Sequence, residues 1–237
     1  MFIFVRTTKL LKFELLSKYD SIDIPVYLMP GMAASPKIFE HWDFPKPFRL
    51  ERLSWISPLP QESLDAYALR MWDRIPDENP ILIGVSFGGV LVQEMAKLRA
   101  VKKVVVLSSI KSHQEMPLSM KMATYTQLHK YLPLKWVRNV DTLAQFAFGK
   151  NIQKRLEMYQ KYLSERDPEY LAWAIDALVH WKQSQVLPNT LHIHGDEDTV
   201  FPIKNLKASY LTLSGGHAIV LTQHRWFNEK LPELLLQ

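Results

Sequence analysis

A serine flanked by glycines is the first point in this chain where residue types and their spacing indicate chemistry. Gly84 and Gly88 stand two residues before and after Ser86, and Gly89 follows directly. With 15 serines and 8 glycines in 237 residues, composition alone predicts only about 0.02 such Gly-x-Ser-x-Gly motifs. The motif lies between an apolar run typical of a buried strand and an amphipathic run typical of a helix. We therefore interpret Ser86 as a nucleophile exposed on a strand-to-helix turn, rather than as an incidental serine in a glycine-rich turn.

A serine hydroxyl is a weak nucleophile at neutral pH, so it needs a base that is itself oriented by an acid. Two later segments supply such groups. Residues 192–202 read His-Ile-His-Gly-Asp-Glu-Asp-Thr-Val-Phe-Pro, and residues 214–218 read Ser-Gly-Gly-His-Ala. Each segment follows a run that predicts a strand, so both are expected at the same carboxyl edge of a sheet as Ser86.

The elements that must position these groups alternate along the chain. Short apolar runs predict strands, and amphipathic runs between them predict helices. Strands are expected at 26–29, 48–56, 81–85, 103–107, 191–194 and 210–213, and helices at 63–75, 90–98 and 226–236. Ser63 is expected to cap the first of these helices, and another helix is expected to begin at Ser35-Pro36. Continuous apolar strands alternating with helices favour the α/β class, with a mostly parallel central sheet flanked by helices.

Residues 111–185 interrupt this alternation, because they hold helical patterns without a strand. We interpret them as a helical cap insertion, which leaves residues 1–110 and 186–237 as the core. The insertion has 11 Lys and Arg against 7 Asp and Glu, so it carries +4 of the net charge of +5. These charges are expected to solvate exposed helices, and binding of an acidic substrate stays open. Its methionines and aromatics suit an acyl pocket, but most are expected to pack the cap onto the core: Met116, Met120, Met122, Tyr125, Trp136, Phe146 and Phe148.

These segments together resemble the α/β-hydrolase superfamily from about residue 26 to the C-terminus. The order of the triad along the chain in that fold is serine, acid, histidine. The acid usually falls in His-Gly-x-x-Asp-x-x-x-Pro, which residues 194–202 match, and this favours Asp198 over the acidic residues at 196 and 197. The histidine often follows a Gly-Gly pair after the last strand, which matches His217. The resemblance also implies a β-hairpin in the first 25 residues, although residues 8–19 fit an amphipathic helix equally well.

The resemblance further implies an oxyanion hole made by the backbone N–H groups of Phe87 and Met32. Met32 directly follows Gly31, the glycine after the first strand. Many family members have His-Gly where this chain has Pro30-Gly31, but the N–H that is needed comes one residue after the glycine. The turns of these motifs hold seven of the eight glycines, at 31, 84, 88, 89, 195, 215 and 216.

The expected function is that of a serine hydrolase that cleaves a carboxylic ester or thioester through an acyl-enzyme intermediate, as a carboxylesterase or thioesterase does. Ser86 would attack the carbonyl, His217 would transfer the proton, and Asp198 would orient His217. No metal or organic cofactor is expected. Two alternatives stay open: a carbon–carbon bond hydrolase or cofactor-free lyase with the same triad, and a non-catalytic receptor that binds a ligand in the same fold.

A zinc site is a further alternative, because residues 192–196 match His-x-His-x-Asp. A fuller metal motif would have another histidine at 197, where this chain has Glu197. We favour a role for His194 in hydrogen bonding within the loop of the acid.

Composition limits the other function classes. The chain has no cysteine, which excludes disulfides, thiolate catalysis and cysteine-ligated zinc. Its basic runs are only two residues long, so nucleic-acid binding is not expected. No stretch approaches the length of a membrane span, and the apolar run at residues 1–5 is too short for a signal peptide. A cytoplasmic protein with a small acyl substrate is expected, and the sequence leaves its oligomeric state unknown.

Overall fold

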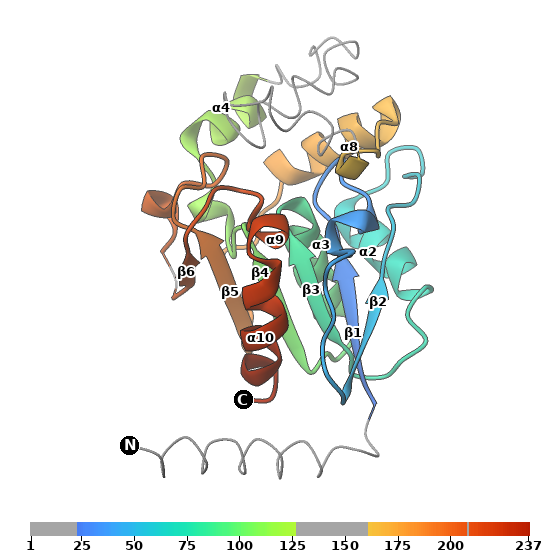
Figure 1. Cartoon of the computed structure of the whole chain (residues 1–237). Helices are drawn as coiled ribbons and strands as arrows, with labels where there is room; N and C mark the ends of the chain where they lie inside the picture. The colour runs from blue at the N-terminus through green and yellow to red at the C-terminus, as the bar shows by residue number, and fades with distance from the viewer. Residues whose placement is uncertain (1–22, 127–160, 208) are drawn as a thin grey trace, which may run out of the picture.

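The computed structural model describes residues 23–126, 161–207 and 209–237, which form one six-stranded sheet covered by helices. The strands run in the order β2-β1-β3-β4-β5-β6, and every neighbouring pair is parallel. Their bounds are β1 Ile24–Met29, β2 Phe48–Arg52, β3 Ile81–Val85, β4 Lys103–Leu107, β5 Thr190–Gly195 and β6 Leu211–Leu213. The parallel sheet between helices is as the sequence predicted (Figure 1).

The helices lie on both faces of the sheet and above its carboxyl edge. Their bounds are η1 Pro36–Phe39, α2 Leu64–Trp72, α3 Phe87–Leu98, η2 His113–Glu115, α4 Leu118–Thr126, α8 Pro168–Val179, η4 Ile203–Asn205, α9 Ile219–Thr222 and α10 His224–Leu235. One core cluster packs α2 and α3 against the sheet, and the other packs η1, α9 and α10 against the opposite face. Figure 1 shows α4 and α8 beyond the carboxyl ends of the strands.

Burial on both faces explains why the central strands consist of continuous apolar runs. All five residues of β3 are buried, and so are four of the five residues of β4. A strand with water on one face would instead alternate apolar and polar side chains. The central strands are therefore rigid supports for the loops at their carboxyl ends.

Most expected elements differ from the structure by one to three residues at their ends, and three local expectations differ further. β2 ends at Arg52 instead of reaching residue 56, because the chain there leaves the edge of the sheet and the Trp55 indole donates to the carbonyl of Gly31 at 3.0 Å. The segment after Ser35 forms a four-residue 3-10 helix, η1, instead of a longer helix. Ser63 stands at the N-cap position of α2, but its side chain makes no capping hydrogen bond.

The segment between β4 and β5 is helical where the structure describes it, in η2, α4 and α8. Residues 127–160 lie outside the described residues, so the division into a core and a cap at 111–185 stays a prediction. The alternatives for the first 25 residues likewise fall almost wholly outside the described part. Among the described helices, none has the length and apolar character to cross a membrane.

Candidate active site

Ser86 occupies a strained turn between β3 and α3. Its backbone angles are φ 53° and ψ −121°, a conformation that side-chain-bearing residues adopt rarely and that surrounding contacts must hold. The backbone N–H of Ser86 donates to the carbonyl of Leu107 on β4 at 2.9 Å, and its carbonyl accepts the Ser109 hydroxyl at 2.7 Å. Contacts from the neighbouring strand thus keep the Ser86 side chain on the tip of the turn.

The glycines around Ser86 are required by close backbone contacts. A Cβ atom built on Gly84 would lie 2.2 Å from the carbonyl oxygen of Gly88. One built on Gly88 would lie 2.2 Å from the carbonyl oxygen of Pro30, at the end of β1. One built on Gly89 would lie 2.6 Å from the hydroxyl of Ser109. The Gly-x-Ser-x-Gly spacing therefore lets α3 begin directly against β1 and β4.

Ser86, His217 and Asp198 meet at the carboxyl edge of the sheet, although they are far apart along the chain. Nε2 of His217 lies 2.9 Å from Oγ of Ser86, and Nδ1 of His217 lies 2.8 Å from Oδ2 of Asp198. The three groups thus form one hydrogen-bonded series. The carboxylates at 196 and 197 do not join it, and Oδ1 of Asp196 instead accepts the N–H of Gly215 at 2.9 Å.

The carboxylate of Asp198 is buried and stabilised as an anion. Burial alone would raise its pKa, but the charge of His217 and hydrogen bonds from His194, His217 and the N–H of Phe201 outweigh burial and lower the pKa below its usual range. The N–H groups of Val200 and Phe201 donate to Oδ1 at 2.8 and 3.0 Å. Asp198 is therefore charged at neutral pH and held in a fixed orientation.

His194 hydrogen-bonds within the loop of Asp198, as the sequence predicted. Its Nε2 lies 2.8 Å from the carbonyl oxygen of Phe201 and 3.2 Å from Oδ2 of Asp198. Both partners are acceptors, so Nε2 of His194 carries a proton, and Nδ1 of His194 lies 3.0 Å from Nε2 of His192. Burial, followed by the neighbouring His194, lowers the pKa of His192 to about 2, so His192 is neutral. Within the described ranges, no group of three or more His, Asp or Glu side chains is arranged to hold a metal ion.

A largely apolar cavity opens above Ser86. Its walls come from the loop after β1, from α9, from the acid loop and from the predicted cap: Gly31, Met32, Ala33, Ala34, Ile38, Val85, Ser86, Phe87, Met120, Tyr162, Leu163, Leu178, Val200, Phe201, His217, Ala218, Val220 and Leu221. None of these side chains is Lys, Arg, Asp or Glu. Both residues expected to form the oxyanion hole, Phe87 and Met32, are among them.

The methionines and aromatic residues of the predicted cap lie in different environments. Met120 lines the cavity, whereas Met116 is buried in the core and Met122 is 55% exposed. The side chain of Tyr125 and the aromatics at 136, 146 and 148 lie outside the described residues. Sequence reasoning missed Tyr162, Leu163 and Leu178 as wall residues, because apolar side chains in a helical segment carry no motif that separates a cavity wall from ordinary packing.

The proteins that resemble this chain are found by similarity of structure and not of sequence. No family model matches the chain, and no curated protein sequence matches it significantly. A hydrolase from Pseudomonas aeruginosa aligns with a TM-score of 0.69 and 16% identity over 91% of each chain. An esterase from Exiguobacterium antarcticum aligns with a TM-score of 0.68 and 17% identity over 90% of this chain and 92% of the esterase. The enol-lactonase from Burkholderia xenovorans aligns with a TM-score of 0.67 and 15% identity over 91% of this chain and 92% of the lactonase. The chain therefore has the α/β-hydrolase fold, as its motifs predicted.

Proposed function

We propose that the protein is a serine hydrolase that cleaves a carboxylic ester or thioester. The observation that carries this proposal is the His217 ring, which bridges Oγ of Ser86 at 2.9 Å and Oδ2 of Asp198 at 2.8 Å. A base within hydrogen-bond reach of a hydroxyl, with an ionised acid behind it, is the arrangement that activates a serine. The esterase and the enol-lactonase among the structural neighbours are consistent with this reaction class.

The reaction follows from these positions. Oγ of Ser86 attacks the carbonyl carbon while Nε2 of His217 takes the hydroxyl proton, and the carbonyl oxygen becomes an oxyanion. The backbone N–H groups of Phe87 and Met32 donate to that oxyanion. His217 then gives its proton to the leaving alcohol or thiol, which departs with its bonding electrons. Water hydrolyses the acyl-enzyme by the same route, and Asp198 stabilises the imidazolium in both halves.

The cavity walls favour an uncharged acyl group. Among the described residues that line the cavity, the polar side chains are Ser86, His217 and Tyr162, and the hydroxyl of Tyr162 already donates to Glu40. A carboxylate on the acyl chain would lose its hydration without gaining a charged partner among these described residues. We therefore expect neutral, apolar acyl esters as substrates.

The first test is labelling with a fluorophosphonate probe, with wild type beside Ser86→Ala and His217→Ala. We expect the wild type to be labelled, Ser86→Ala to remain unlabelled, and His217→Ala to be labelled far more slowly because its serine lacks a base. Thermal melting of all three proteins shows whether each is folded. Absence of labelling in folded wild type would contradict the proposal and favour the receptor alternative.

The second test concerns the acyl group. The p-nitrophenyl ester of hexanoic acid is compared with the matched mono-ester of adipic acid, which ends in a carboxylate. We expect kcat/KM to be about 100-fold or more higher for the neutral ester, because an unpaired buried charge is costly. Equal rates for the two esters would contradict the expectation of an uncharged acyl group.

A further inference from the structure

The loop that carries Met32 needs external support. This oxyanion loop, residues 31–35, follows β1 and includes Ala33 at φ 62°. A residue other than glycine persists at positive φ only where the surrounding structure holds it there. Within the loop, the N–H of Ala34 donates to the carbonyl of Gly31 at 3.0 Å. The rest of the support comes from outside the loop.

Part of that support comes from the segment that precedes α8. The N–H of Ser35 donates to the carbonyl of Tyr162 at 2.9 Å, and the N–H of Glu165 donates to the carbonyl of Ala33 at 3.0 Å. Residues 162–165 thus lie alongside the oxyanion loop and share two main-chain hydrogen bonds with it. This segment belongs to the predicted cap, so an element of the cap directly contacts the expected oxyanion hole.

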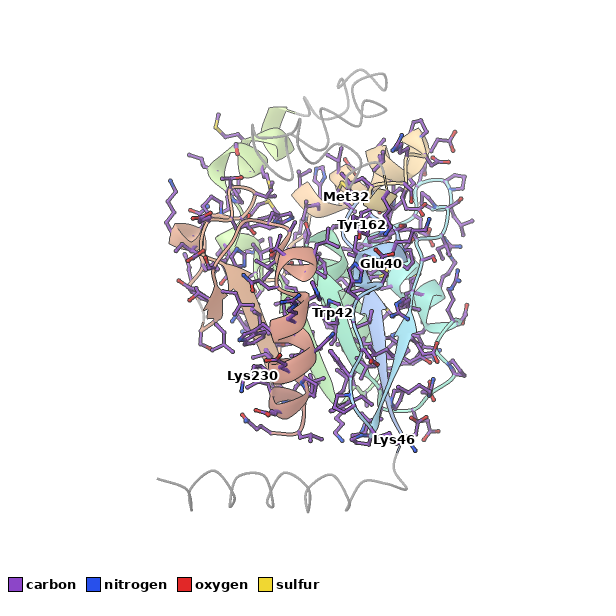
Figure 2. The ribbon with its side chains drawn as sticks, viewed as in Figure 1. Met32, Glu40, Trp42, Lys46, Tyr162 and Lys230 are labelled. Atoms are coloured by element: carbon purple, nitrogen blue, oxygen red, sulfur yellow. The ribbon has the colours of Figure 1, made fainter. Side chains whose placement is uncertain are left out.

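The segment is in turn attached to the core by a clasp of three side chains: Glu40, Lys161 and Tyr162. The hydroxyl of Tyr162 donates to Oε1 of Glu40 at 2.5 Å, and Nζ of Lys161 donates to the same oxygen. Figure 2 shows Tyr162 between Met32 and Glu40. Tyr162 is buried, and its ring also lines the cavity.

Charge favours a closed clasp at neutral pH. Hydrogen bonds from Lys161 and then from Tyr162 lower the pKa of Glu40, so its carboxylate is ionised and accepts both donors. Burial and then the bond to Glu40 raise the pKa of Tyr162, so its hydroxyl keeps the proton that it donates.

We propose that Tyr162 is a positioning residue, whose bond to Glu40 holds residues 162–165 against the oxyanion loop and so sets the direction of the Met32 N–H. The proposal rests on the hydrolase function proposed above. It makes oxyanion stabilisation depend on a contact between the predicted cap and the core. Glu40 acts through Tyr162, and neither side chain touches the reacting atoms.

The variants Tyr162→Phe and Glu40→Ala test the proposal. Each removes the bond and keeps the catalytic side chains, and Tyr162→Phe also keeps the aromatic wall. We expect kcat on the hexanoate ester to fall about tenfold with KM nearly unchanged, because a displaced donor costs less than the 10²- to 10³-fold of a deleted one. The kcat of the double variant should be no lower than that of either single variant. Glu40→Gln retains an acceptor oxygen and should recover most of the rate.

A transition-state analogue separates positioning from general packing. Oγ of Ser86 adds to the carbonyl carbon of an alkyl trifluoromethyl ketone. The hydroxyl proton passes to His217, and the carbonyl oxygen becomes an oxyanion. The inhibition constant of this ketone should rise in Tyr162→Phe by the same factor by which kcat falls. A loss of packing alone would not produce that match.

Tyr27→Phe is the matched control. The hydroxyl of Tyr27 also donates to a carboxylate, that of Asp77, but Tyr27 lies on β1 and does not line the cavity. Its kcat and inhibition constant should equal those of wild type. Folded Tyr162→Phe with unchanged kcat and inhibition would overturn the inference while fluorophosphonate labelling of wild type still supports the hydrolase. Absence of labelling in wild type would overturn both. If Tyr162→Phe does not fold, Glu40→Ala carries the same test.

Discussion

Gly88→Ala should damage both the stability and the activity of the protein, although alanine favours a helix. Gly88 lies in the first turn of α3, where propensity alone would stabilise the alanine variant by about 1 kcal/mol. The new Cβ atom, however, would lie 2.2 Å from the carbonyl oxygen of Pro30, whereas ordinary contact begins at 3.4 Å. The end of β1 and the start of α3 must therefore separate by about 1.2 Å.

Overpacking of this size costs about 1–3 kcal/mol, which exceeds the gain in propensity, so the free energy of unfolding should fall. The catalytic loss should be larger. Phe87 and Met32 lie on the two sides of the contact, and a misplacement of about 1 Å in a catalytic site costs about 100-fold in rate. Urea unfolding measures the first effect, and kcat on a p-nitrophenyl ester measures the second.

Gly216→Ala is the matched control, because it adds the same methyl group beside His217. The nearest atom to a Cβ there is the carbonyl oxygen of Glu197 at 3.8 Å, an ordinary contact. Its kcat and stability should stay close to those of wild type. A Gly88→Ala protein with wild-type kcat and raised stability would refute the argument, because it would show that β1 and α3 do not need their close approach.

Asp198→Asn should lower kcat about 10⁴-fold in steady-state assays, because His217 loses the carboxylate that orients it. A loss below tenfold would show that another group orients His217. The same carboxylate predicts a pH dependence. Its pKa is lowered on folding, so its contribution to stability is complete above the unfolded value of about 3.9 and is lost as the pH falls through the lower folded value. In urea titrations, the gap in unfolding free energy between wild type and Asp198→Asn should therefore narrow below about pH 4, and a gap that widens with acid would contradict the assignment. His194→Phe should lower the free energy of unfolding by about 2–3 kcal/mol, because it leaves the Phe201 carbonyl and Nε2 of His192 buried without the ring that contacts both. A loss under about 0.5 kcal/mol in the same titrations would mean that water replaces the ring.

The strands were the most predictable elements. Residues 81–85 and 103–107 were expected as strands with the same bounds that the structure has. Strands buried on both faces must be apolar throughout, so their sequences mark their ends clearly. The edge strand β2 was overestimated, because residues 53–56 are as apolar as a strand but contribute Leu53 and Trp55 to the core from a non-strand segment. Local hydrophobicity does not distinguish these two ways of being buried.

The candidate site was predictable where glycine spacing and motif order constrain it. Sequence motifs point to Ser86, Asp198 and His217, and the structure brings the three side chains within hydrogen-bond distance. The role expected for His194 also followed from its position before the acid. No motif points to Tyr162 or to its partner Glu40, because a hydrogen bond between residues 122 positions apart leaves no local pattern in the sequence.

The sequence by itself determined the alternation of elements, the strained serine turn and the groups available for catalysis, because each depends on residues close together in the chain. The tertiary structure decided which residues line the cavity above Ser86 and what supports the loop at residues 31–35. Those features depend on residues of the loop after β1, of α9 and of the segment 161–165, which meet only when the chain folds. Contacts of that kind are set by packing in three dimensions, which no short stretch of sequence encodes.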